Sequence, residues 1–206
     1  MRIMVSGTTR SLYRLVDDYR DNLGVLIEPH GGMALQTIAK LGLPWVADNG
    51  AFLGLDHAKW LRLLAKIHGA SPRWVVVPDR PRDAVETLRL WGVWSPVLEA
   101  LGLPRAFVLQ DGQEDHELPL AEAYFIGGGD WWRESLTMRQ FLRDVVIPRG
   151  QWLHMGRVNS DRRIRCALDL GCDSIDGTGY SRWGDRWLQS DLEYLRDLER
   201  TPRLFA

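Results

Sequence analysis

The chain has 206 residues, of which 45% are hydrophobic, so it is long enough for one domain with a large core. Its net charge is −1, which excludes an overall basic field that would by itself indicate a nucleic-acid partner. No apolar run approaches the ~20 residues that span a bilayer, and the first residues, MRIMVSGTTR, lack the apolar segment of a signal peptide. We therefore expect a cytoplasmic protein that does not enter a membrane.

Short runs rich in β-forming residues alternate with amphipathic helical stretches along the chain. The expected strands span residues 2–5, 25–28, 45–48, 74–78, 106–110, 123–126, 151–155 and 173–176. Helical patterns lie between them, for example over residues 56–69 and 162–171, and Gly171 is an expected C-cap. A closing helix is expected over 190–200, with Ser190 as its N-cap.

This alternation predicts the fold class. Strands that alternate with helices form βα units and a parallel sheet, and eight such units fit a closed (β/α)₈ TIM barrel. An open doubly wound sheet is the alternative, but it usually has fewer strands, and no GxGxxG follows the first strand. The sequence therefore favours an α/β protein with a single compact barrel domain over residues 1–206.

Two features of the composition bear on ligands. Only three of the 26 basic residues are Lys, and the Arg excess reflects either GC-rich codon usage or arginines that grip phosphates through their planar fork. The two cysteines, Cys166 and Cys172, form neither a disulfide framework nor a CxxC pair. We expect buried thiols, no bound metal and no cofactor.

Polar residues follow nearly every apolar run, at the strand ends where barrel enzymes collect their functional groups. In chain order they are Glu28 and His30, Asp48 and Asn49, Asp79, Gln110 and Asp111, Gly127 to Gly129, His154 and Gly156, and Asp173 and Asp176. A single Asp after a strand is often only a helix cap or a turn residue. The same coincidence at six strands indicates a site.

The glycine run and the histidine each allow two interpretations. The N–H groups of residues 127–129 either approach a flat ligand or an oxyanion, or the run simply forms a tight turn. His154 has no second His or Cys at metal-ligand spacing, so packing or hydrogen bonding is favoured over metal binding.

The motifs DNGAF, VVPD, FVLQDG, FIGGG, HMGR and SIDGTGYSR resemble, in order and spacing, those of the tRNA-guanine transglycosylase superfamily. The resemblance runs from about residue 45 to residue 182. It implies that Asp176 is the covalent nucleophile and that Asp48 is the second catalytic carboxylate, a general acid or base. The substrate-binding residues that it implies are Asp79 for the base edge, Gln110 with the amides near Gly127 and Gly128 for the base carbonyl, and His154, Met155 and Arg182.

The departures from the family pattern concern the pocket and the substrate. Ala51 stands where the family usually has a second Gly, which implies a narrower pocket, and the family's C-terminal Cys/His zinc module is absent. The chain resembles instead the shortened phage-type members that place 7-deazaguanine bases into DNA. DNA is therefore favoured over tRNA as the nucleic-acid partner, a 7-deazaguanine base is the expected small-molecule substrate, and an oligomer or accessory partner stays open.

Two other classes of function fit the same residues. One is a barrel hydrolase acting on a nucleoside-like small molecule, and the other is a catalytically silent base-binding module. Trp131, Trp132 and Trp183 bear on the choice, because tryptophans at the mouth of the barrel either stack on nucleotides or pack the helices against the barrel.

Overall fold

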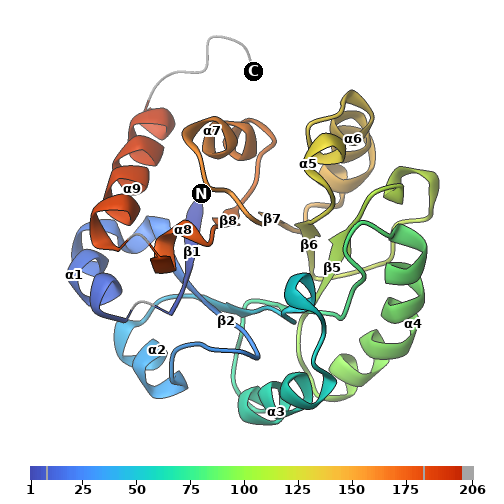
Figure 1. Cartoon of the computed structure of the whole chain (residues 1–206), viewed down its shortest axis with the longest axis horizontal. Helices are drawn as coiled ribbons and strands as arrows, with labels where there is room; N and C mark the ends of the chain where they lie inside the picture. Colours follow the sequence, from blue (N-terminus) through green and yellow to red (C-terminus); the bar gives the residue numbers. More distant parts are fainter. Residues whose placement is uncertain (8, 183, 201–206) are drawn as a thin grey trace.

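The computed structural model describes residues 1–7, 9–182 and 184–200, and within these ranges the strands form one closed, all-parallel barrel (Figure 1). The strands are β1 (Arg2–Ser6), β2 (Leu23–Ile27), β3 (Trp45–Ala47), β4 (Val75–Val76), β5 (Arg105–Leu109), β6 (Ala123–Ile126), β7 (Trp152–Met155) and β8 (Ser174–Asp176). Each strand pairs with the next in sequence, and β8 closes the ring on β1. The (β/α)₈ barrel is confirmed, and the open doubly wound sheet is excluded.

Helices surround the barrel as an outer ring (Figure 1). They are α1 (Thr9–Tyr19), α2 (Leu35–Leu41), α3 (His57–Ile67), α4 (Ala84–Ala100), α5 (Asp130–Arg133), α6 (Leu136–Phe141), α7 (Asp161–Asp169), α8 (Gly179–Arg182) and α9 (Asp185–Arg200). A π-helical turn (Leu142–Val146) and a 3₁₀ turn (Ile147–Arg149) lead from α6 towards β7. No helix in the described ranges combines the length and apolar character needed to cross a lipid bilayer.

Successive side chains on each strand point in opposite directions, which divides the core into two layers. Residues such as Ile3, Val25 and Ile175 face the helices and belong to one large apolar cluster. The barrel interior holds a separate cluster, made of Met4, Leu26, Val46, Trp74, Val76, Ala106, Val108 and Ala123, with Phe125 and Trp152 packed against it. The lower barrel is thus filled by side chains, and a ligand can enter only at an end.

The predicted closing helix begins too late in the sequence. The α9 helix starts at Asp185, and Ser190 lies exposed in its interior rather than at its N-cap. Leu188, Leu192 and Leu195 are buried at helical spacing, so the apolar face of the helix begins before Ser190. The predicted stop of α7 is correct to one residue, because Leu170 is the C-cap and the Gly171 N–H donates to the Leu168 carbonyl (3.0 Å).

Asp173 was grouped with the functional strand ends, and the structure corrects this. It precedes β8 and accepts the Leu153 N–H through Oδ2 (2.8 Å). It therefore lies at the N-terminal end of the barrel strand, opposite the end that carries Asp176, and its carboxylate ties β8 to β7.

Candidate active site

A pocket opens at the C-terminal ends of the strands and brings together side chains from far apart in the sequence. Asp48 and Asp79 follow β3 and β4, Gln110 follows β5, and Asp176 is the last residue of β8; all four line this pocket. Val76, Val108 and Phe125 form its apolar walls. Its empty space, counted out to the open mouth and including the solvent there, is about 560 Å³.

A hydrogen-bonded network fixes Asp79 in the pocket. Gln110 Nε2 donates to Asp79 Oδ2 and Asn49 Nδ2 donates to Asp79 Oδ1, both at 2.7 Å. The Gln110 amide cannot be flipped without loss, because its Oε1 accepts the N–H groups of Arg82 and Gly128, both at 2.8 Å. Each carboxylate oxygen of Asp79 therefore accepts one hydrogen bond, and the residue still lines the pocket.

Three carboxylates in or beside this pocket have raised pKa values. Burial, and next the charge of Asp176, raise the pKa of Asp48 to about 7, although the Gly50 N–H opposes the shift. Burial raises the pKa of Asp79 to about 6 against the two amide donors. The pKa of Glu28, beside the pocket, is raised by burial and by the charge of Asp176. A pKa near neutrality suits Asp48 to give and take a proton at physiological pH.

His154 lies directly below Asp176 inside the barrel and is fully buried. Its Nε2 is 2.9 Å from Asp176 Oδ2, and its Nδ1 is 2.8 Å from Ser174 Oγ, which also accepts the Trp152 indole N–H. An ionised carboxylate only accepts hydrogen bonds, so Nε2 carries the proton in this pair. His154 thus holds one oxygen of Asp176 in place, in agreement with the hydrogen-bonding role favoured from the sequence. It does not line the pocket, so it is not placed to contact the substrate as the resemblance implies.

The second oxygen of Asp176 is held by the backbone of the loop after β7. The Arg157 N–H donates to Asp176 Oδ1 (3.1 Å), and the Val158 N–H donates to the Asp176 carbonyl (2.6 Å). Gly156 makes this approach possible, since a Cβ there would lie 2.6 Å from the Phe125 ring and 3.3 Å from Asp176 Oδ2. Asp176 is therefore fixed on two sides, and its side chain stays 19% exposed, towards the pocket.

The amides of the glycine run already have internal partners. The Gly127 N–H donates to the Leu109 carbonyl within the sheet (3.0 Å), and the Gly128 N–H donates to Gln110. Gly128 has a φ of +70° and a Cβ there would lie 2.4 Å from Trp132, so the backbone passes close over that ring. Both glycines line the pocket, as predicted, but in this structure their N–H groups shape the protein and do not point to a free ligand position.

Several predicted residues lie elsewhere. Met155 faces away from the pocket into the core between β7 and the helices, because it neighbours the inward His154 on the same strand. Ala51, expected to narrow the pocket, does not line it. Trp132 is buried and packs the barrel, whereas Trp131 is 73% exposed. The side chain of Arg182 and all of Trp183 lie outside the described residues.

Besides Pro81 and the apolar wall residues Val76, Val108 and Phe125, three residues that line the pocket have no role in the sequence-based hypothesis. They are Phe52, Arg82 and Arg157, which line the pocket at its mouth. Each stands within a few residues of a predicted strand end, and this proximity was the available signal. Their positions depend on loop conformations that no local pattern specifies.

The comparisons with known proteins add no relative. A scan against models of protein families finds no match, and a search of curated proteins finds no similar sequence. Within the described ranges, no three His, Cys, Asp or Glu side chains are grouped so that they could hold a metal ion. The geometry of the pocket is therefore what indicates the function.

Proposed function

We propose that this protein is a transglycosylase of the guanine-exchanging type, which replaces guanine in DNA with a 7-deazaguanine base. The observation that carries the proposal is the arrangement of Asp176 and Asp48 in one pocket. Asp176 is held by His154 and by the Arg157 N–H, while Asp48 has a pKa of about 7 beside it. Such a pair supplies a fixed nucleophile and a separate group that handles protons, as in retaining glycosidases.

The reaction has two half-reactions with balanced bonds. In the first, a carboxylate oxygen of Asp176 bonds to C1′ of the target nucleotide as the C1′–N9 bond breaks, and protonated Asp48 supplies the proton that the departing guanine takes up. In the second, the incoming base loses its N9 proton to Asp48, N9 bonds to C1′, and the bond from C1′ to Asp176 breaks. Asp48 ends protonated and Asp176 ends ionised, so the site is ready for another cycle.

The chemistry of the pocket also suits a guanine-like base. Guanine offers N–H donors along one edge and the O6 acceptor beside them. The Asp79 carboxylate supplies acceptors for the donors, and the Gln110 amide lies next to it to face the carbonyl. Val76, Val108 and Phe125 supply the apolar surface for the faces of the ring. The target nucleotide has to leave the base stack to reach this depth, which costs a few kcal/mol.

Incorporation of labelled guanine tests the proposal. The wild-type protein is incubated with radiolabelled guanine and DNA in one reaction, and with radiolabelled guanine and tRNA in another. The label in each washed polymer is then counted. We expect label in DNA, and we expect unlabelled 7-deazaguanine derivatives to compete with it. Label in tRNA alone would support the base-exchange reaction and refute DNA as the substrate. Release of guanine without incorporation would indicate a hydrolase, and neither release nor incorporation would contradict the proposal.

A further inference from the structure

Two arginines at the mouth of the pocket have an unusual backbone conformation. In the described part of the chain, Arg82 (φ 66°) and Arg157 (φ 57°) are the non-glycine residues with positive φ. Such a conformation is strained for a residue with a Cβ, and it persists only where the surroundings enforce it. Both residues line the pocket. Their coincidence at one site indicates that the conformation serves the site.

The backbone of each arginine supports a pocket residue. The Arg82 N–H donates to Gln110 Oε1 (2.8 Å), and the Arg157 N–H donates to Asp176 Oδ1 (3.1 Å). Arg82 follows β4 and Arg157 follows β7, which are three strands apart around the ring. The same turns that aim the two N–H groups inwards therefore place two guanidinium-bearing side chains on different sides of the mouth.

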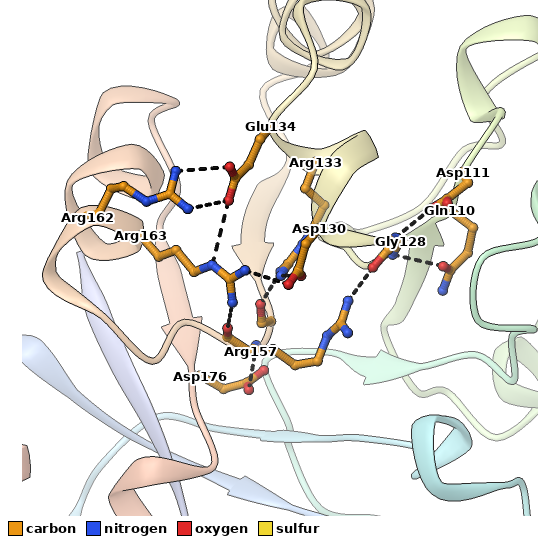
Figure 2. A network of polar contacts seen from close by, with 12 residues as sticks. Gln110, Asp111, Gly128, Asp130, Arg133, Glu134, Arg157, Arg162, Arg163 and Asp176 are labelled. Carbon is orange, nitrogen blue, oxygen red and sulfur yellow. Dashed lines mark hydrogen bonds and ion pairs between the residues drawn. The ribbon is translucent and has the colours of Figure 1, made fainter.

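Neither guanidinium forms an ion pair with a carboxylate within the described ranges. Arg157 donates to the Gly128 carbonyl (Figure 2), and its guanidinium carbon lies 4.6 Å from the centre of the Phe52 ring. Burial, and next the charge of Arg133, lower its pKa, so its positive charge is poorly compensated. An anion bound at this position would compensate that charge.

The nearby acids are already engaged by other arginines. Arg133 and Arg163 each lie 2.7 Å from Asp130 and hold its pKa at about 2, and Arg162 forms a two-pronged pair with Glu134 (Figure 2). This cluster therefore leaves Arg157 without a carboxylate while adding positive charge around it. The pocket combines an acidic floor with a basic rim, which matches a nucleotide whose base and sugar lie inside and whose phosphates lie at the edge.

We propose that Arg82 and Arg157 bind the two phosphates that flank the reacting nucleotide, one on each side of the mouth, so that the substrate is a polynucleotide and not a free nucleoside. The inference rests on the proposed function and specifies how its substrate is held. The planar fork of arginine suits phosphate oxygens. Fixing both phosphates would place C1′ over Asp176 and would hold the nucleotide out of its stack.

The test measures the binding of a short single-stranded DNA oligonucleotide with one guanine, as a function of salt concentration. Each lost phosphate contact lowers the magnitude of the slope of log K against log[salt] by about 0.7 for a single strand. We expect this loss for Arg82→Gln and for Arg157→Gln, about twice as much for the double variant, and recovery in Arg157→Lys. The matched control is Arg143→Gln, since Arg143 is exposed in the turn that leads towards the N-terminal end of β7. Thermal melting verifies that each variant is folded.

Chemically neutral linkages sharpen the assignment. A methylphosphonate is placed on the 5′ or on the 3′ side of the guanine. We expect each Gln variant to be insensitive to one of these replacements and sensitive to the other. The proposed binding of the two flanking phosphates by Arg82 and Arg157 is here called the phosphate clamp. Slopes equal to that of Arg143→Gln in both variants would overturn this clamp, as would the absence of binding by the wild-type protein at low salt. Because binding requires no turnover, a wild-type protein that binds without exchanging guanine would refute the function and not the clamp.

Discussion

Replacing Asp176 with Asn should abolish base exchange, with a loss of at least about 10³-fold, while the barrel remains folded. Asn has nearly the same shape as Asp, so the hydrogen bond from the Arg157 N–H and the close packing of the side chain against Gly156 are retained. The Asn side chain offers no ionised oxygen to attack C1′. Guanine incorporation and the melting temperature are measured on the same preparation. A shifted melting temperature with exchange near the wild-type rate would mean that Asp176 only stabilises its turn.

The same strand supplies the control for this variant. Asp173 precedes β8 and lies at the opposite end of the barrel, where it accepts the Leu153 N–H. Asp173→Asn makes the same chemical change outside the pocket, so it should leave the exchange rate within a few-fold of wild type. A comparable loss of exchange in both variants would show that the measurement reports stability and not chemistry.

Replacing Asp48 with Asn should lower turnover by about 10²–10⁴-fold, the usual contribution of a general acid or base. The wild-type rate should change with pH around a pKa of about 7, and the variant should lose this dependence. If Asp48 serves mainly the second half-reaction, the covalent intermediate will accumulate in the variant. Rates measured from pH 5 to pH 9, with DNA and guanine saturating, decide this. A variant that retains the transition near pH 7 would assign that transition to another group.

The same substitution should change how stability depends on pH. The pKa of Asp48 rises from 3.8 to about 7 on folding, so the folded protein binds more protons than the unfolded chain between these values. The resulting stabilisation is fully present below pH 3.8 and is lost as the pH rises through about 7, a loss of roughly 2.6 kcal/mol between pH 5 and pH 8. In Asp48→Asn this loss should vanish, while smaller losses of the same sign remain from Asp79 and Asp191, whose pKa values are raised to about 6. Urea unfolding at the two pH values measures it, and equal losses in variant and wild type would contradict the burial of Asp48.

Much of the barrel could be predicted from alternation alone. Apolar runs identify the strands within one or two residues, because a strand inside a barrel has to be apolar on both faces. The polar residues that end β3, β4, β5 and β8 converge for a topological reason, since all parallel strands end at one side. Asp48, Asp79, Gln110 and Asp176 therefore meet as predicted.

The errors have definite causes. Met155 could have been assigned correctly, because neighbours on a strand face opposite ways and His154 points inwards. Asp173 could have been recognised as a residue before its strand. The positions of Arg82 and Arg157 could not be predicted from the sequence, because residue type does not indicate that an arginine adopts a left-handed conformation. The partner of the Gly128 amide depends on how Gln110 is oriented by the loops after β4 and β6.

The most direct test of the account is to locate the covalent intermediate. The wild-type protein and, in parallel, the Asp48→Asn variant are each mixed with a guanine-containing DNA oligonucleotide without added base, then denatured, digested and examined by mass spectrometry. The account predicts that the peptide containing residues 174–180 carries the sugar of the oligonucleotide, bonded to Asp176, and that free guanine is released in equal amount. Guanine exchange that proceeds with no adduct, or with an adduct on a residue other than Asp176, would contradict it.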